Sequence, residues 1–175
     1  MGKTEPHSDM SAPPSEPFCG DFGIRIGRDG TWFYHGSPIG RKPLVRLFAS
    51  VLGRDEAGDY WLVTPVERGR IEVEDVPFIA VELTVEGEGR DRILRFRTNI
   101  DDEVAADRAH PLRLALNPDT GEPSPYILVR DRLEARLSRP VFYQLVDLAE
   151  ERDTAAGKVL GVWSKGEFFP LGPSG

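Results

Sequence analysis

Asp29-Gly-Thr-Trp-Phe-Tyr-His-Gly-Ser-Pro-Ile-Gly-Arg-Lys-Pro-Leu-Val-Arg-Leu-Phe48 is the stretch around which the chain is organised. It begins with an Asp-Gly pair between two short apolar runs, Ile24-Arg-Ile26 and Trp32-Phe-Tyr34. Glycine accepts the left-handed backbone that a tight turn needs, so this order predicts strand, turn and strand.

The end of the same stretch predicts a helix. Pro43 suits a first helical turn, where its missing N–H costs nothing. The apolar residues that follow are spaced i, i+3, i+4, i+7 and i+8, which is typical of one helix face, and Gly53 is expected to end the helix. These apolar residues are Leu44, Leu47, Phe48, Val51 and Leu52.

The bulk properties limit the classes of function. A chain of 175 residues forms one medium domain or two small ones, and its net charge of −7 disfavours coating duplex nucleic acid or an anionic membrane. Cys19 is the only cysteine, which suits a reducing cytoplasm. Residues 1–20 are polar and rich in proline and predict a flexible tail without a signal peptide. No apolar run is long enough to span a membrane.

The segments 79–85 and 92–98 predict a hairpin. Pairing Leu83 with Leu94 and Val81 with Phe96 puts the apolar residues on one face. That register sets Glu82 beside Arg95 and leaves Arg97 without a carboxylate opposite it.

The acidic segment 101–107 predicts a short helix or an exposed loop that divides two halves. We therefore expect a tail at 1–20, an N-terminal α+β domain at 21–100 and a β-rich C-terminal domain at 101–175. The second domain is expected to contain a hairpin at 126–129 and 133–137, a helix opened by Pro140, and a closing hairpin at 158–163 and 167–169. The expected buried residues of that helix are Val141, Phe142, Leu145, Val146 and Ala149.

Two stretches, 24–62 and 127–160, share one order of features. Each contains strand, Arg-Asp, strand, a basic residue before proline, helix, Arg-Asp and strand. The similarity indicates either an internal duplication or a common order that arose by chance. Duplication would give an α+β fold of two tandem β-rich halves, each with a small antiparallel sheet and one main helix.

Most standard catalytic signatures are absent from the sequence. It contains no phosphate-binding GxxxxGK[ST], no HExxH and no GxSxG, and its three histidines are far apart. We therefore assign no catalytic residue, no metal ligand and no cofactor. The run Asp101-Asp102-Glu103 could hold Mg²⁺, or it could be a solvated helix start.

Arg41 and Lys42 are the best candidates for ligand binding. Unpaired N–H groups at a helix N-terminus attract anions, and two cations before Pro43 would strengthen such a site. The alternative is ordinary surface charge that is paired with Glu67 or Asp75.

The aromatic strand adds candidates of another kind. Phe33 is expected in the core, whereas Trp32 and Tyr34 on the opposite face could stack on a base or pack against the second half. Polar residues at strand ends could line a cleft or form turns. The complete predicted ligand-binding set is Trp32, Tyr34, Arg41, Lys42, Thr64, Arg97 and Asn99.

The opening stretch also resembles the bacterial family called domain of unknown function 1285. Segments at 60–67, 73–78, 96–99 and 163–171 share this resemblance, which covers about residues 20–172. It implies a two-domain α+β fold with an internal duplication and a C-terminal half superficially like a pleckstrin-homology domain. It also implies no established enzymatic activity, a nucleotide-like ligand between the halves, and a signalling role.

The expected function is therefore a non-catalytic cytoplasmic module that binds a small anionic or nucleotide-like ligand, with a signalling protein as a further partner. The N-terminal half should supply the site and the C-terminal half the opposite wall. Two alternatives remain: a protein-interaction scaffold, or a metal-dependent hydrolase that uses Glu67 and Asp75.

Overall fold

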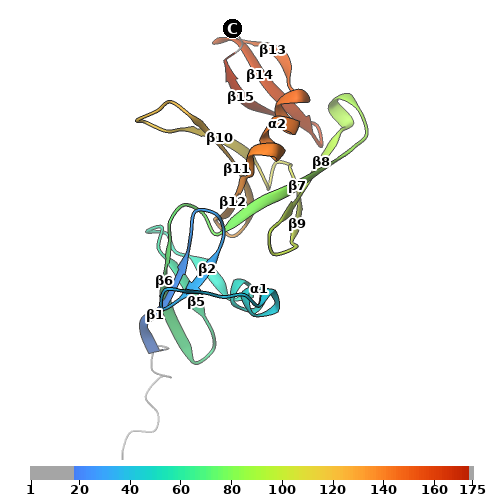
Figure 1. Ribbon diagram of the computed structural model, residues 1–175. Coiled ribbons are helices and arrows are strands. Elements are labelled where there is room, and N and C mark those ends of the chain that lie inside the picture. Colours follow the sequence, from blue (N-terminus) through green and yellow to red (C-terminus); the bar gives the residue numbers. More distant parts are fainter. Residues whose placement is uncertain (1–17, 174–175) are drawn as a thin grey trace, which may run out of the picture.

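The fold is mostly β and is built from three sheets. The structure, a computed structural model, describes residues 18–173 (Figure 1). Most of the expected tail, residues 1–20, lies outside this range, and its last three residues begin the first strand. The first sheet has the order β3-β2-β1-β6-β5-β4. Its strands are β1 (Phe18–Ile26), β2 (Trp32–Tyr34), β3 (Ser37–Pro38), β4 (Leu52–Arg54), β5 (Tyr60–Val63) and β6 (Glu67–Val73).

The second sheet has the order β10-β11-β12-β7-β8-β9. Its strands are β7 (Phe78–Glu86), β8 (Ile93–Thr98), β9 (Glu103–Ala105), β10 (Leu112–Leu116), β11 (Pro123–Arg130) and β12 (Leu133–Leu137). The third sheet has the strands β13 (Glu150–Thr154), β14 (Gly157–Ser164) and β15 (Glu167–Pro173). The α-helices are α1 (Lys42–Ser50) and α2 (Arg139–Asp147), and a short 3-10 turn spans Gly89–Asp91.

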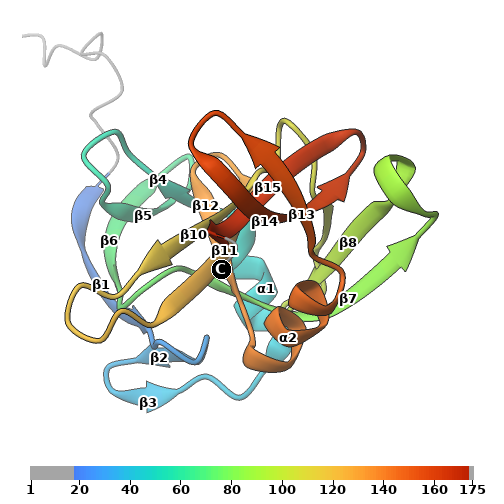
Figure 2. The ribbon, with the colours of Figure 1, turned by 90° about the horizontal axis from the view of Figure 1, so that it is seen from above.

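The two six-stranded sheets form tandem halves (Figures 1 and 2). The division between them falls between residues 73 and 78, and not at residue 100, which was the boundary expected from sequence. The strands β7 and β8 were assigned to the N-terminal half, but they pair within the second sheet. The main sheet of each half is six-stranded and mixed, which corrects the expectation of small antiparallel sheets.

Both sheets follow one plan. Two three-stranded antiparallel meanders meet at a central parallel pair, which is β1 with β6 in the first sheet and β7 with β12 in the second. The proposed repeat units nevertheless associate differently. After α1 the chain returns to the sheet that it left, whereas after α2 it forms the separate third sheet. The structure therefore does not confirm the duplication, and the likeness to a pleckstrin-homology domain stays a prediction.

The core of the N-terminal half contains Trp32, which is 1% exposed and stacks on Phe48 with 6.4 Å between ring centroids. Helix α1 buries Val45 and Ala49, so the predicted apolar stripe was partly wrong. Leu47 is 62% exposed. The chain turns directly from α1 into β4, so Leu52 is buried as a strand residue and Gly53 does not end the helix.

The second half was predicted more closely. The hairpin β11–β12, helix α2 and hairpin β14–β15 are all present, and α2 buries Val141 and Leu145 as expected. Val146 is instead 43% exposed. The acidic segment after residue 100 forms a turn and then β9, and not a helix.

The register of β7 and β8 differs from the predicted one by two residues. Leu83 pairs with Phe96 and Glu82 with Arg97, and a bulge between Ala80 and Glu82 shifts the register by one residue at that point. A shift of two keeps the same side chains on the same face, so hydrophobic alternation alone could not distinguish the two registers. The expectation that Arg97 lacks a carboxylate was therefore wrong.

Candidate functional site

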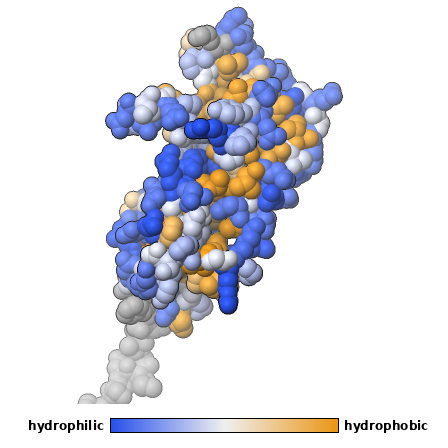
Figure 3. Space-filling model, in the orientation of Figure 1, coloured by the Kyte–Doolittle hydropathy of each residue, from blue (hydrophilic) through white to orange (hydrophobic). Residues whose placement is uncertain are grey.

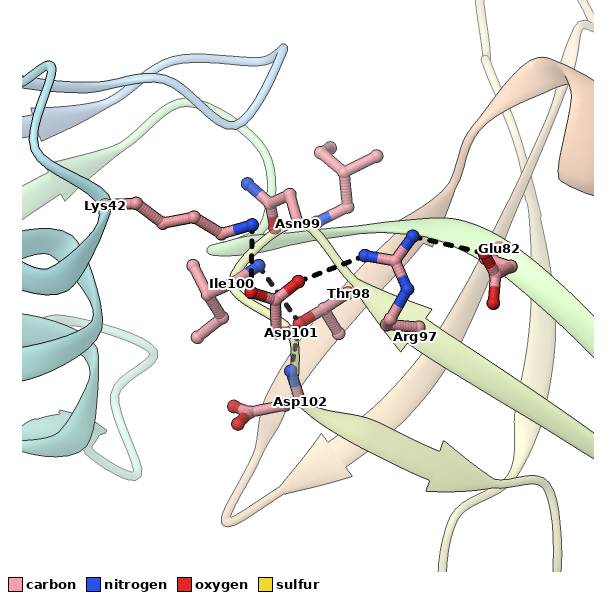
Figure 4. A network of polar contacts seen from close by, with 9 residues as sticks. Lys42, Glu82, Arg97, Thr98, Asn99, Ile100, Asp101 and Asp102 are labelled. Carbon is pink, nitrogen blue, oxygen red and sulfur yellow. Dashed lines mark hydrogen bonds and ion pairs between the residues drawn. The ribbon is translucent and has the colours of Figure 1, made fainter.

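Three of the predicted ligand-binding residues meet where the halves join (Figure 4). Lys42 comes from the first turn of α1, Arg97 from β8, and Asn99 from the turn that follows. Asp101 lies between the two cations. Its Oδ2 is 2.9 Å from Lys42 Nζ and its Oδ1 is 3.1 Å from Arg97 Nη1.

This network neutralises the cations. Arg97 also contacts Glu82 at 3.2 Å, so it has two carboxylate partners. The hydrogen bond from Lys42 is the main cause that lowers the pKa of Asp101, and Arg97 lowers it further. Lys42 therefore forms an ion pair across the two halves, whereas Arg97 forms its ion pairs within the second half, and neither is the free cation that the predicted anion site required.

The polar rim predicted at residues 97–99 is also internally satisfied. Asn99 Oδ1 accepts the Ile79 N–H at 3.0 Å, and its Nδ2 donates to the Gly30 carbonyl oxygen at 3.4 Å. Gly30 has a φ of +87°, and a Cβ there would come within 2.7 Å of Asn99 Nδ2. Asn99 thus packs the β1–β2 turn against β7.

The remaining predicted residues are scattered. Thr64 Oγ1 exchanges hydrogen bonds with the backbone of Glu67, which is turn chemistry. Trp32 is buried, so it cannot stack on a ligand. Tyr34 is 53% exposed, with its ring beside that of His35. Arg41 is exposed and has no ion-pair partner among the described residues, so only one cation of the predicted pair is free.

The structure contains another cavity that sequence reasoning missed. Its volume is about 350 Å³, and it lies between the halves. The β1–β2 turn contributes Arg28, and the segments around β11, β12 and the start of α2 contribute the other walls. The lining residues are Arg28, Glu122, Pro123, Ser124, Pro125, Arg136, Leu137, Ser138, Arg139, Phe142 and Tyr143.

Arg136 is the anchored cation of this cavity. Its Nη1 lies 3.0 Å from Asp75 Oδ2, and its Nη2 donates to the Arg28 carbonyl oxygen at 2.7 Å. The side chains of Arg136 and Asp75 are only 18% and 16% exposed. The hydroxyl of Tyr126 donates to Asp75 at 2.9 Å, and burial together with this bond raises the pKa of Tyr126. The guanidinium is thus fixed from two sides, and it retains further N–H donors.

Arg28 and Arg139 are less constrained. The Arg28 side chain has no partner among the described residues, while its backbone N–H donates to Glu74 at 2.7 Å and so fixes the turn. Arg139 lies 3.9 Å from Glu122, and both side chains are mostly exposed.

The start of α2 adds donors to the same cavity. Its N-cap residue, Ser138, makes no capping hydrogen bond, and the first turn contains no acidic residue. Pro140 has no N–H, and the N–H groups of Ser138 and Phe142 are already hydrogen-bonded. The first turn can therefore offer a ligand only the N–H groups of Arg139 and Val141.

The sequence offered little signal for this cavity. Arg139 before Pro140 was visible, but Arg28 and Arg136 are 108 residues apart and meet only through the packing of the halves. The alternation of β12 buries Leu133, Ala135 and Leu137, so it turns Arg136 outward. Figure 3 shows the molecule from the same side as Figure 1, and on this side the hydrophobic residues gather mainly on the upper half, around α2.

The hydrolase candidates do not form a site. Glu67 begins β6 and Asp75 follows its end, so the two carboxylates lie at opposite ends of one strand. Asp75 is committed to Arg136 and Tyr126. Within residues 18–173, no three His, Cys, Asp or Glu side chains are grouped so that they could hold a metal ion. None of the helices in this range is long and apolar enough to cross a membrane.

The fold and its cavity define a mostly β protein of two tandem sheet domains with a polar cavity between them. The chain belongs to the DUF1285 family. Residues 13–76 match the domain of unknown function described as the DUF1285 N-terminal domain, and residues 77–171 match the protein of unknown function described as the DUF1285 C-terminal domain. The resemblance seen in the sequence is therefore confirmed.

Two solved structures are similar to this chain. A DUF1285 family protein from Silicibacter pomeroyi DSS-3 is 49% identical, with a TM-score of 0.83, over 90% of this chain and 84% of that protein. A DUF1285 family protein from Shewanella baltica OS155 is 27% identical, with a TM-score of 0.56, over 71% of this chain and 91% of that one. No curated protein matches.

Proposed function

We propose that the protein is a non-catalytic, cytoplasmic binding module for a small anionic, nucleotide-like ligand, which it holds in the cavity between its halves. The observation that carries this proposal is the meeting of Arg28, Arg136 and Arg139 around one cavity at the start of α2. Each arginine comes from a different element, so their convergence is a product of the fold.

The chemistry of the cavity suits an oxyanion. Guanidinium groups present planar forks of donors that match carboxylate and phosphate oxygens. The unpaired N–H groups at the start of α2 add donors and a favourable dipole.

The size and the apolar walls suit a ligand that also carries a ring. Phe142 and the 60% exposed Tyr143 could contact a planar group. A volume near 350 Å³ lies at the lower end of the range for small-molecule sites.

This proposal keeps the interface between the halves but relocates the site. The N-terminal half was expected to bind the ligand, whereas here it supplies Arg28 and the C-terminal half supplies most of the lining. A ligand that contacts both halves would favour one arrangement of them, which is how we propose that binding reaches a signalling partner.

A protein-interaction role is the second candidate, and one observation favours it. The outer side of α1 exposes Leu44 and Leu47 beside the unpaired Arg41, around an open recess. Exposed apolar residues next to a free cation are typical of contact surfaces.

A thermal-shift screen with nucleotides and phosphorylated metabolites tests the proposal. We expect at least one ligand to stabilise the wild type, and Arg28→Ala and Arg139→Ala each to weaken binding about tenfold or more. Arg108→Ala is the matched control, because Arg108 is exposed and does not line the cavity.

Two outcomes would contradict the proposal. If stabilisation is lost in Arg41→Ala but kept in Arg28→Ala, the site lies at α1. If no ligand in the set stabilises the wild type, binding of this class is excluded.

A further inference from the structure

We infer, on the basis of the proposed function, that the cavity selects a ligand with one negative charge, such as a phosphodiester, over the doubly charged phosphomonoester. The inference rests on the carboxylates that accompany the three arginines, since they determine how much positive charge remains available to a ligand.

Asp75 removes the net charge of Arg136. The two side chains are in contact at 3.0 Å and are both mostly buried, so solvent screens this pair weakly. Tyr126 donates to the same carboxylate, which helps to hold it in place. Arg136 therefore offers a ligand oriented hydrogen bonds but little charge.

Glu122 partly offsets Arg139. It lines the same cavity, and its Oε1 lies 3.9 Å from Arg139 Nη2. Three arginines and two carboxylates leave one net positive charge around the cavity. The charged neighbours behind this wall are already paired with each other, as Arg25 with Glu74 and Arg113 with Glu134.

A charge-balanced complex is favoured in a partly enclosed site. A phosphodiester carries one negative charge and balances the cavity, whereas a phosphomonoester carries nearly two at neutral pH and leaves an uncompensated charge. Asp75 and Glu122 thus act as specificity-determining residues by limiting the positive charge, and neither has to touch the ligand.

The test compares adenosine 5′-monophosphate with its O-methyl ester, which differs by one methyl group and one charge. Titration calorimetry at pH 8 in low salt measures the ratio of the two dissociation constants. We expect the ester to bind the wild type more tightly. Asp75→Asn and Glu122→Gln should each shift the ratio toward the monophosphate roughly three- to tenfold, the effect of one unit charge several ångströms away.

Glu88→Gln is the control, because it makes the same charge change on the exposed β7–β8 turn, outside the cavity lining. Its ratio should equal that of the wild type. The side chain of Glu122 is 68% exposed, so Glu122→Gln should fold normally. The prediction can therefore still be tested if Asp75→Asn misfolds.

The outcomes separate the two proposals. Suppose that both nucleotides bind and that Arg28→Ala weakens both. Charge selection is then wrong if the monophosphate binds the wild type as tightly as the ester, or if neither Asp75→Asn nor Glu122→Gln shifts the ratio. The proposed binding site is retained in either case. If neither nucleotide binds, or if Arg28→Ala leaves their dissociation constants unchanged, both proposals are wrong for nucleotides.

Discussion

Arg130 in β11 donates from Nη2 to the carbonyl oxygen of Ala49, in the last turn of α1, over 2.5 Å, and its Nη1 reaches the Leu52 carbonyl oxygen at 3.4 Å. A cation from the second half thus caps a helix of the first. Carbonyl groups at a helix C-terminus lack partners within the helix and carry partial negative charge, so this contact satisfies them and fixes α1 against the second sheet.

Removal of this cap should destabilise the protein. We expect Arg130→Ala to lower the free energy of unfolding by about 1–2 kcal/mol, because charged hydrogen bonds to partly buried carbonyl groups are lost. Urea denaturation measures the change. Arg132→Ala is the matched control, since its contact with Glu56 is long and exposed and should contribute little. Equal stability of the two variants would contradict the capping role.

Gly69 should not tolerate a side chain. A Cβ at this position in β6 would overlap the ring of Phe22, which packs against the core. We expect Gly69→Ala to cost about 1–3 kcal/mol of unfolding free energy, the usual range for overpacking. Gly53→Ala in β4 is the control, because a Cβ there meets nothing within 4 Å. The measurement is the denaturant concentration at which half of each variant is unfolded. If Gly69→Ala unfolds at the same concentration as the wild type, the packing argument is wrong.

The ion pairs of Asp101 should make stability depend on acid. Its pKa is lowered in the folded state, chiefly by Lys42, so its contribution is present above the ordinary carboxyl value of 3.8 and is lost as the pH falls toward the lower folded value. We expect Asp101→Asn to be less stable than the wild type at pH 7. Asparagine tolerates the φ of +70° at this position, so backbone strain is not introduced.

The same pair of proteins provides the check on this acid dependence. Thermal melts from pH 7 down to pH 2 should show the difference between wild type and Asp101→Asn shrinking below about pH 4. A difference that stays constant across this range would mean that the ion pairs do not stabilise the fold.

Trp32 should affect folding and not binding. Its ring is buried against Phe48, and its Nε1 has no hydrogen-bond partner within the described residues. We expect Trp32→Ala to cost about 3–5 kcal/mol, as for other buried aromatic residues. Trp32→Phe should cost less, because it removes the unpartnered N–H and keeps a ring. Ligand affinity that falls in a stable Trp32→Phe variant would restore Trp32 to the binding site.

The sequence predicted local elements better than their associations. The hairpin β11–β12 and helix α2 follow from alternation and from Pro140, which act within a few residues. Lys42 is paired and not free because of Asp101, whose left-handed backbone places its carboxylate between two cations. The spacing of apolar residues in the sequence cannot predict such a contact, because it forms only when the halves pack together.

The site that we propose differs in place from the one that the sequence predicted. The sequence placed an anionic ligand at the start of α1, whereas the cavity that gathers three arginines lies at the start of α2. Arg28 and Arg136 come from turns and strand faces whose outward residues look like ordinary surface charge in the sequence. Only the packing of the two halves brings them to one cavity.

The central parallel pairs have a consequence for how the chain folds. In each six-stranded sheet the strand that comes first in the chain pairs with the strand that comes last, so the middle of the sheet forms only after all six strands are available. Contacts between such distant strands raise the contact order, and proteins with many of them fold slowly. A ribosome would have to release residue 73 before the first sheet could close, and residue 137 before the second. Each six-stranded sheet should therefore form in one late step. A chain truncated within β6 or β12 should lose the central parallel pair of that sheet, and not merely an edge strand.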